Sequence, residues 1–400
     1  MDNASEAGRM EKVRSAVDRE RLVETAMSLI SVPSPTRSAG AVADRLAEIL
    51  ANDGFEVQRP VADWPEAPAV VVRLKSDRPG PTLQFDGHLD TVHLPFVPPR
   101  LEEGVLYGSG ASDMKGGIAA AVEALRALRE SEALAGGGVL LTAHDHHEGP
   151  WGDRRQVRAL VAEGHVGDAV MLPEYLADRL PLAGRGMAIF EVSFRREGDP
   201  VHEVLRAPET PDVLATGAEL VCRLRSMNRS LAKTSDPWSG RDTVFVGLFE
   251  SGEIYNQAPV ACSVRGTRRW VTPGRTGAVD AGFRELVDEL AVESRTSATV
   301  DFQVQGDAFQ VSREDAIVSA FQTAYTAVSG GELPFGGKPF VDDGNTYAAL
   351  AGIPALTHGP DGKGAHTLSE VVEVDELVRV ARVYAMTAVA YCGGGVQGPE

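Results

Sequence analysis

Gly87-His88-Leu89-Asp90-Thr91-Val92 follows the apolar run Pro81-Thr82-Leu83-Gln84-Phe85, which has the composition of a buried strand. An imidazole and a carboxylate two residues apart at the end of a strand point to the same side of the pleat. One of the pair can then bind a cation while the other orients it or bridges onward. Such a pair is weak evidence alone, and the case for a site depends on motifs further along the chain.

Helices and strands alternate around this stretch. Apolar residues recur at helical spacing in 19–30 and in 39–53, and Pro33 and Pro35 follow the first of these segments. This alternation, with short loops, predicts an α/β sheet flanked by helices. Further strands are expected at 57–59, 70–74, 105–107 and 139–141, and a further helix at 118–128.

The glycine-rich loop GSGASDMKGG, residues 108–117, lies directly before the helix expected at 118–128. Glycines allow the backbone to approach a ligand closely, and Asp113 lies near the N-terminus of that helix. A phosphate-binding loop is the competing interpretation, but the GKS or GKT ending is absent and a carboxylate repels phosphate. A metal-binding Asp113 fits this loop better.

The segment TAHDHHEGPWG, residues 142–152, is the densest group of metal-capable side chains in the chain. Three histidines, one aspartate and one glutamate lie within His144–Glu148. Histidine and carboxylate side chains in such a group are typical metal ligands. The strand-like segment AVMLPE ends in Glu174, and open α/β sheets bind their ligands at the carboxyl ends of strands.

The texture of the sequence changes at about residue 186. From there to 304 the expected order is strand, helix, strand, strand, helix, strand, which is the ferredoxin-like βαββαβ pattern. A helix at 314–328, two turn-rich segments and a helix at 374–391 follow. We therefore expect a lid or dimerisation domain of residues 186–307, inserted into a catalytic metal-binding domain of residues 1–185 and 308–400.

Composition excludes several classes of function. The chain has 400 residues, 43% of them hydrophobic, which is enough for a sizeable core, and its formal net charge of −18 disfavours nucleic acid and anionic membrane surfaces. Its three cysteines lack CxxC spacing, so we expect free thiols in a reducing compartment. Neither a secretory signal nor a run of membrane-spanning length is apparent, so a soluble, cytoplasmic protein is expected.

The ordered set GHLDTV, YGSGASDMKGG, a glutamate after a later strand, and GIPALTHGP followed by AHT resembles one family over nearly the whole chain. That family comprises the di-metal peptidases and deacylases and includes aminoacylase, carboxypeptidase G, acetylornithine deacetylase and succinyl-diaminopimelate desuccinylase. The resemblance implies a zinc-exopeptidase-like catalytic domain, with a mixed sheet flanked by helices, and an inserted ferredoxin-like α+β lid.

The resemblance also implies a role for each matching residue of the metal site. His88 would bind one metal, and Asp90 would orient His88. Asp113 would bridge both metals, Glu174 would complete the first metal site, and His366 in GAHT would bind the second. The alternative for His366, a histidine of a surface turn, loses weight once the other motifs are counted.

Three residues of the lid match further motifs of the family. His202, in Gly198-Asp199-Pro200-Val201-His202, would polarise the substrate carbonyl, usually across a dimer interface. Asn256 begins the family's NxxP motif, and Arg269, thirteen residues later, would hold a substrate carboxylate. Because Arg269 belongs to an arginine-rich strand, a solvated edge charge is the alternative interpretation.

The sequence departs from the family where the general base and a metal ligand normally form a pair of glutamates. Aligning the family's DEEGP with HHEGP makes His147 the base and Glu148 the ligand. A register one or two residues earlier would make His146 or His147 the ligand, with Asp145 or His146 as the base. Charge favours the first register, since Asp113, Glu174 and Glu148 together offset three of the four charges of two divalent ions.

The resemblance implies a metal-dependent hydrolase that cleaves an amide-type C–N bond of an N-acyl amino acid or peptide through a metal-activated water. Two divalent ions per subunit are expected, zinc by default, with manganese or cobalt as alternatives. The expected partners are a small-molecule substrate and a second copy of the chain, joined through the lid. Two other functions stay open: an aminohydrolase acting on a non-peptide C–N bond, and a metal-binding member that has lost hydrolysis.

Overall fold

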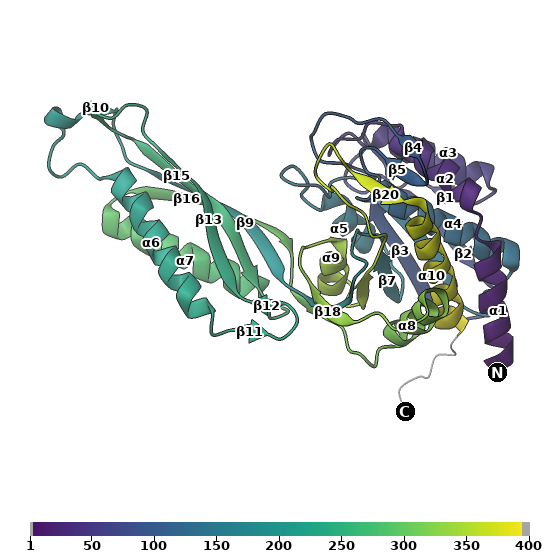
Figure 1. Ribbon diagram of the computed structural model, residues 1–400. Helices are drawn as coiled ribbons and strands as arrows, with labels where there is room; N and C mark the ends of the chain where they lie inside the picture. Colours follow the sequence, from purple (N-terminus) through teal and green to yellow (C-terminus); the bar gives the residue numbers. More distant parts are fainter. Residues whose placement is uncertain (1–2, 394–400) are drawn as a thin grey trace. The chain divides into compact units, whose positions relative to one another are not determined.

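The computed structural model describes residues 3–393, which divide into two compact units (Figure 1). The first unit contains the chain up to Leu182, Val311–Gly337, and the chain from Asp342. The second contains Ala183–Gln310 and Lys338–Val341. Together they form the mixed α/β architecture with an inserted α+β unit that the sequence predicts, so the fold class is confirmed.

The first unit is built on a six-stranded sheet of order β1-β2-β6-β3-β7-β19. Its central strands are parallel: β3 pairs with β6 and β7, and β7 pairs with β19. Parallel strands place their carboxyl ends at one edge of the sheet, where side chains of separate loops can meet. The strands are β1 (Val57–Gln58), β2 (Val70–Lys75), β3 (Thr82–His88), β6 (Gly138–His144), β7 (Ala169–Leu172) and β19 (Ala355–Thr357).

Helices cover both faces of this sheet (Figure 1). On one face α4 and α10 pack against β3 and β6, and α1, α2, α3 and α8 extend the same core. On the other face α5 and α9 lie together, and Tyr347 of α9 packs with Val170 and Leu172 of β7. The helices are α1 (Asn3–Ala16), α2 (Arg19–Ile30), α3 (Gly40–Asn52), α4 (Lys115–Ser131), α5 (Arg155–Ala162), α8 (Ala316–Ser329), α9 (Asp343–Leu350) and α10 (Val374–Gly393).

Two three-stranded sheets also lie within the described residues. One has the order β17-β8-β18 and the other the order β20-β5-β4. The second of them leads into the glycine-rich loop, because that loop begins directly after β5, which pairs with β20. The strands are β4 (Arg100–Glu102), β5 (Val105–Tyr107), β8 (Leu180–Gly184), β17 (Phe309–Gln310), β18 (Phe335–Lys338) and β20 (Val371–Glu373).

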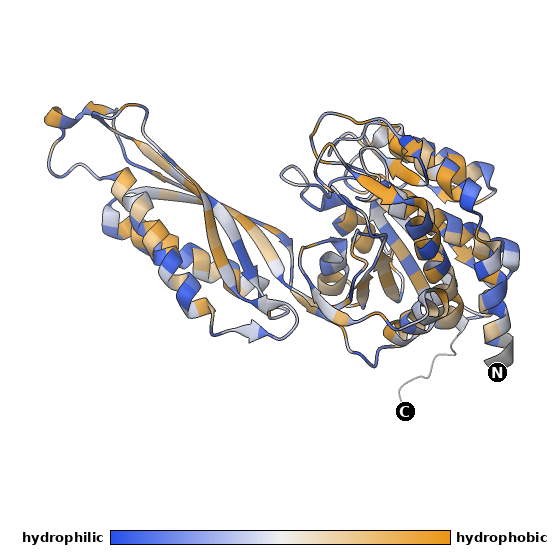
Figure 2. Cartoon of the chain, in the orientation of Figure 1, coloured by the Kyte–Doolittle hydropathy of each residue, from blue (hydrophilic) through white to orange (hydrophobic). Residues whose placement is uncertain are grey.

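The second unit has the chain order β9-α6-β13-β15-α7-β16, which is the βαββαβ pattern expected from the sequence. Its antiparallel sheet has the order β13-β15-β9-β16, with α6 and α7 on one face. Hydrophobic and hydrophilic residues alternate around both helices (Figure 2). The elements are β9 (Gly186–Arg195), α6 (Val213–Leu231), β13 (Thr243–Ser251), β15 (Ala261–Trp270), α7 (Thr276–Ser294) and β16 (Ser297–Gly306).

Short strands extend from the main sheet of this unit. A ribbon pairs β10 (Val201–His202) with β14 (Gln257–Ala258), and a second ribbon pairs β11 (Ser235–Asp236) with β12 (Gly240–Arg241). A single 3-10 turn, η1 (Glu203–Leu205), follows β10.

The structure also contains helices that the sequence does not predict. The turn-rich segment from Val341 contains α9, and α1 and α5 have no counterpart among the expected elements. None of the helices within residues 3–393 is both long and apolar enough to cross a bilayer.

Candidate metal centre

The expected metal ligands of the first unit meet beyond the carboxyl ends of the parallel strands. His88 is the last residue of β3, and it lies opposite His144, the last residue of β6. The loop after β6 supplies His147 and Glu148, and Glu174 follows β7. The buried carboxylates and imidazoles of these loops form groups in which the potential ligand atoms lie within 4.8 Å of one another.

Asp113 connects two sets of these side chains. One carboxylate oxygen, Oδ1, lies 3.2 Å from Nε2 of His88, and the other, Oδ2, lies 3.1 Å from Nε2 of His366. The same His366 nitrogen lies 3.1 Å from Oε1 of Glu148. Metal–ligand distances of about 2.0–2.2 Å put neighbouring tetrahedral ligands roughly 3.3–3.6 Å apart, so these spacings suit one cation on each side of Asp113.

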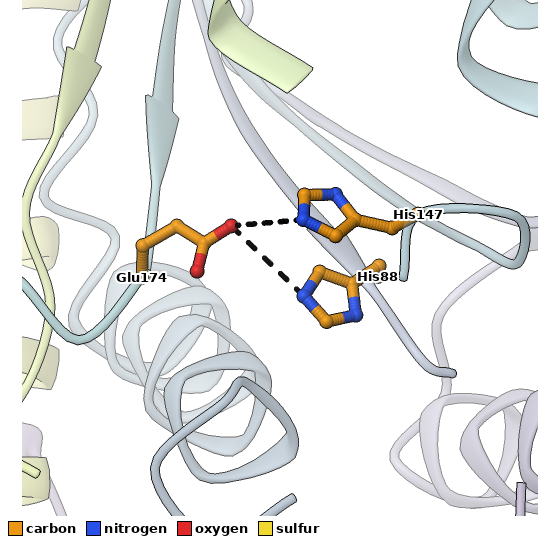
Figure 3. A group of neighbouring side chains, drawn as sticks. All are labelled: His88, His147 and Glu174. Atoms are coloured by element: carbon orange, nitrogen blue, oxygen red, sulfur yellow. Dashed lines mark ion pairs between the residues drawn. The ribbon is translucent and has the colours of Figure 1, made fainter. Parts of the chain in front are cut away.

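Glu174 completes the set on the His88 side. Its Oε1 atom lies 3.9 Å from Nε2 of His88 and 3.6 Å from Nε2 of His147 (Figure 3). This oxygen is buried and has no hydrogen-bond partner among the described residues. Burial and the neighbouring Asp113 raise the pKa of Glu174 well above its usual value. A buried, unpartnered carboxylate oxygen facing imidazole nitrogens is what a metal-binding site requires, so the donor set fits a divalent cation.

The pKa of His88 is also raised. Burial opposes its protonation, but the hydrogen bond to Asp113 and the charges of Asp90 and Glu174 outweigh burial and raise its pKa well above the usual range. The carboxylates around His88 therefore favour a positive charge at this point. A proton supplies that charge in the metal-free protein, and a bound cation can supply it instead.

Asp90 connects the end of β3 to the loop after β6 through hydrogen bonds. Nδ1 of His88 lies 2.9 Å from the main-chain oxygen of Asp90 and 3.6 Å from its carboxylate. The carboxylate accepts hydrogen bonds from the main-chain amides of His147 and Glu148, the latter at 2.8 Å. Asp90 thus fixes the tautomer of His88 through its carbonyl group and fixes the neighbouring loop through its side chain.

His147 stacks on His88 and is held from behind by Asp343. The two imidazole rings lie 3.8 Å apart, centroid to centroid, with an angle of 12° between their planes. Nδ1 of His147 lies 2.6 Å from Oδ2 of Asp343, while Nε2 faces Glu174. Burial, reinforced by the charge of nearby Arg154, lowers the pKa of His147.

A second buried group lies behind this pair. Nε2 of His144 is 3.4 Å from Asp86 and 3.5 Å from Asp343. The donor atoms of these three residues are close enough to hold a cation. Burial opposes protonation of His144, but Asp86 and Asp343 outweigh it and raise its pKa to about 9. A protonated His144 therefore neutralises part of this group at neutral pH.

The earlier alignment register places Asp145 and His146 at the site, and the structure places both outside the groups of candidate ligands. Asp145 accepts hydrogen bonds from the amides of Arg37 and Ala39. The ring of His146 packs edge-on against Trp64 at 4.5 Å. His147 and Glu148 are the residues of this loop that face the other candidate ligands.

The glycine-rich loop is held by a residue that the sequence does not single out. The buried carboxylate of Glu370 accepts hydrogen bonds from the main-chain amides of Gly110, Ser112 and Asp113, at 2.7 to 2.9 Å. Burial raises the pKa of Glu370 to about 7. Its position therefore fixes the backbone that presents Asp113.

The three expected lid residues lie in the second unit. His202 ends β10, and Nδ2 of Asn256 lies 3.2 Å from its Nε2 atom. Arg269 is half-buried on β15, and its Nη1 atom has no hydrogen-bond partner among the described residues. Burial and the nearby Arg185 lower the pKa of Arg269.

Comparisons with known proteins agree with this fold. The model of peptidase family M20/M25/M40 matches residues 85–390. The chain is 26% identical over 392 residues to succinyl-diaminopimelate desuccinylase of Methylobacterium radiotolerans, covering 92% of this chain and 96% of that protein. It is 27% identical over 388 residues to the desuccinylase of Methylobacterium sp. (strain 4-46), covering 92% and 95%.

Solved structures share the fold at lower sequence identity. Aminopeptidase PepT from Bacillus cereus matches with a TM-score of 0.77 and 21% identity, over 94% of this chain and 100% of that one. The dipeptidase Dug1p from Saccharomyces cerevisiae matches with a TM-score of 0.72 and 14% identity, over 98% and 99%. Because the family model covers most of the sequence, the resemblance that the motifs indicate is confirmed: the chain belongs to peptidase family M20/M25/M40 and is a metallohydrolase of C–N bonds.

Proposed function

We propose that this protein hydrolyses the amide bond of an N-acyl amino acid or a small peptide with water activated between two metal ions. The observation that carries the proposal is Asp113, whose two oxygens face His88 on one side and His366 on the other. Glu174 would complete the first position and Glu148 the second. Zinc suits this histidine and carboxylate set best, with manganese or cobalt as alternatives.

Bound divalent ions would polarise the substrate carbonyl and lower the pKa of a shared water. His147 would accept the proton of that water at Nε2, the nitrogen that faces Glu174. Asp90 would hold His88 and the main-chain amides of the loop after β6 in position. His202 would donate a hydrogen bond to the carbonyl oxygen as negative charge develops there.

A substrate with a free carboxylate fits the lid. Arg269 has a partly buried guanidinium in which one nitrogen has no hydrogen-bond partner among residues 3–393, and Arg185 adds a second positive charge nearby. An anion would relieve the repulsion between the two arginines and satisfy this nitrogen. The curated relatives named as succinyl-diaminopimelate desuccinylases support an N-acyl amino acid, and Asn256 would help to hold it beside His202.

We also propose a homodimer joined through the second unit. Strand β13 is an edge strand that exposes Phe245, Leu248 and Phe249. With α6 it lines a groove of about 820 Å³. An apolar edge strand of this length is suited to pairing with a second copy about a two-fold axis. A cytoplasmic location is also proposed, and it is supported by three free cysteines.

Turnover tests the proposed function directly. Protein loaded with zinc should bind about two ions per chain and hydrolyse at least one member of a panel of N-succinyl, N-acetyl and N-benzoyl amino acids and dipeptides. Asp113→Ala should abolish both properties. Two bound ions without turnover on the panel, but with turnover on ureido or amidino compounds, would instead favour an aminohydrolase on a non-peptide bond.

A further inference from the structure

We infer that Asp343 is a positioning residue that holds His147 with its Nε2 lone pair toward the metal centre, so that an aspartate–histidine pair does the work of a single glutamate. The inference rests on the proposed function, because it assigns the group that assists the attacking water. His147 would take a proton from the water at Nε2 as the water oxygen bonds to the carbonyl carbon. The same nitrogen would return this proton to the leaving nitrogen as the C–N bond breaks and its electron pair moves to that nitrogen.

The contact between the two residues is short and buried. Nδ1 of His147 lies 2.6 Å from Oδ2 of Asp343, and the two side chains are 8% and 1% exposed. The other oxygen of Asp343 accepts a hydrogen bond from Nη1 of Arg154 at 3.2 Å. Asp343 also begins α9, where a capping box formed by Asp342 and Asn345 fixes the backbone. Because both oxygens of the Asp343 carboxylate form hydrogen bonds, the oxygen that faces His147 cannot easily rotate away.

This contact decides which nitrogen of His147 carries the hydrogen. Oδ1 of Asp343 is paired with the guanidinium of Arg154 at 3.2 Å, and a buried carboxylate beside a guanidinium is held in its ionised form. An ionised carboxylate only accepts hydrogen bonds, and Nδ1 of His147 must therefore carry the hydrogen. The lone pair is left on Nε2, which faces Glu174.

The stacking of the two imidazoles argues against His147 as a ligand of the ion next to His88. The lone pair of an imidazole nitrogen lies in the plane of its ring. Two rings that are 3.8 Å apart and only 12° from parallel do not direct both lone pairs at one ion. His88 already has Asp113 and Glu174 as neighbours in that position. His147 is therefore free to act on a water molecule beside the ion.

Asp343 also accounts for the charge that the sequence loses at this position. A glutamate base is negatively charged, whereas a neutral imidazole beside two dications resists protonation. A carboxylate against Nδ1 stabilises the imidazolium that forms when Nε2 accepts a proton. The pair of His147 and Asp343 thus restores the negative charge. The charge lies on Asp343 of α9, behind His147, instead of on the loop after β6.

The first test is the tautomer of His147, read from two-bond proton–nitrogen correlation spectra of the full chain labelled with ¹⁵N-histidine. The His147→Gln spectrum identifies the signal. We expect Nδ1 protonated and Nε2 unprotonated in both zinc-free and zinc-loaded protein, and a shift toward the Nε2-protonated form in Asp343→Asn. A wild-type His147 with its hydrogen on Nε2 overturns the inference, whether or not the variant folds and whether or not the protein hydrolyses the panel.

The second test is kinetic and uses Asp86→Asn as the matched control, because Asp86 is equally buried and contacts the same His144 without touching His147. Asp343→Asn should lower kcat by two to four orders of magnitude, with little change in KM or zinc content, whereas Asp86→Asn should lower kcat less than tenfold. Equal losses in both variants would make Asp343 merely structural and overturn the inference.

A double-mutant cycle separates action through His147 from any other role of Asp343. His147→Glu supplies a base that needs no carboxylate behind it and places two like charges together. In that background Asp343→Asn should cost less than tenfold in kcat or increase it. An undiminished loss would mean that Asp343 does not act through His147. Absence of turnover by wild-type protein would count against the proposed function and would leave the tautomer result valid.

Discussion

The carboxylate of Glu370 accepts a hydrogen bond from the main-chain amide of Asp113 at 2.7 Å, although 257 residues separate the two in the chain. The same carboxylate accepts hydrogen bonds from the main-chain amides of Gly110 and Ser112. One side chain from the C-terminal part of the protein therefore fixes the loop that carries Asp113, the proposed bridging metal ligand. The position of Asp113 therefore depends on Glu370, a residue outside the proposed ligand set.

Replacing Glu370 by Ala should loosen this loop. Three buried amides would lose their acceptor, at a cost of about 1–3 kcal/mol for each one left without a partner. We expect a lower free energy of unfolding in urea and weaker binding of both zinc ions. Glu373→Ala, an exposed change on β20, is the control and should alter neither quantity. Unchanged zinc affinity in Glu370→Ala would show that Asp113 needs no such support.

Single substitutions should remove the metals in a defined order. Asp113→Ala should lose both ions together, while His88→Ala should mainly weaken one. Glu148→Ala should lose the ion on the His366 side, and His147→Ala should keep both while kcat falls by about two to four orders of magnitude. Elemental analysis and kinetics on the same preparations check these expectations. If His147→Ala strips zinc and Glu148→Ala does not, the roles of the two residues are reversed.

Stability of the metal-free protein should depend on pH through His144. The pKa of this residue is about 9 in the folded state, because Asp86 and Asp343 outweigh burial, and a histidine of the unfolded chain has a pKa of about 6.5. Protonated His144 thus stabilises the fold fully below about pH 6.5, and this contribution is lost as the pH rises through about 9.

The difference in unfolding free energy between wild type and His144→Gln isolates this effect, since other groups titrate in both proteins. We expect a difference on the order of 3 kcal/mol at pH 6 that shrinks toward pH 9.5. A difference that is independent of pH would mean that the pKa of His144 is the same in the folded and the unfolded chain.

The edge strand β13 should carry the dimer contact. Phe245 is 65% exposed there, so Phe245→Glu should convert a dimer to a monomer, as judged by light scattering. Val292→Glu, at an apolar residue of α7 that is 79% exposed, is the control and should leave the dimer intact. Monomeric wild-type protein at micromolar concentration would contradict the proposal.

Complementation asks whether the two subunits share a site. A chain carrying His202→Ala mixed with one carrying His366→Ala should recover part of the wild-type activity if His202 acts in the neighbouring subunit. Subunit exchange must be confirmed with differently tagged chains. Exchange without recovery would contradict a site shared between the two subunits.

The sequence predicts this fold well where periodicity is strong and poorly where short polar residues start a helix. The βαββαβ order follows from the alternation of β9 and the amphipathic spacing of α6 and α7. In contrast, Asp342-Asp343-Gly344-Asn345 has the composition of a turn, but these residues form a capping box and the first turn of α9. The packing of Tyr347 against β7 then stabilises the helix, and only the folded sheet provides that surface.

The candidate site, like the fold, can be predicted from the sequence only in part. Residues that bring their own motif, such as His88, Asp113 and His366, can be found in the sequence because each lies in a recognisable local pattern. Asp343 and Glu370 act through partners 196 and 257 residues away, and no local pattern marks them. Their roles follow from the parallel strands that bring distant loops to one edge of the sheet.

The exposure of His366 has a kinetic consequence. Its side chain is 52% exposed, whereas those of His88 and Glu174 are 0% and 3% exposed. A ligand that solvent can reach detaches without opening the core, so the cation on the His366 side should exchange rapidly with the medium. The cation on the His88 side should leave only when buried groups separate. In a chelator the protein would then pass through a long-lived state with one ion.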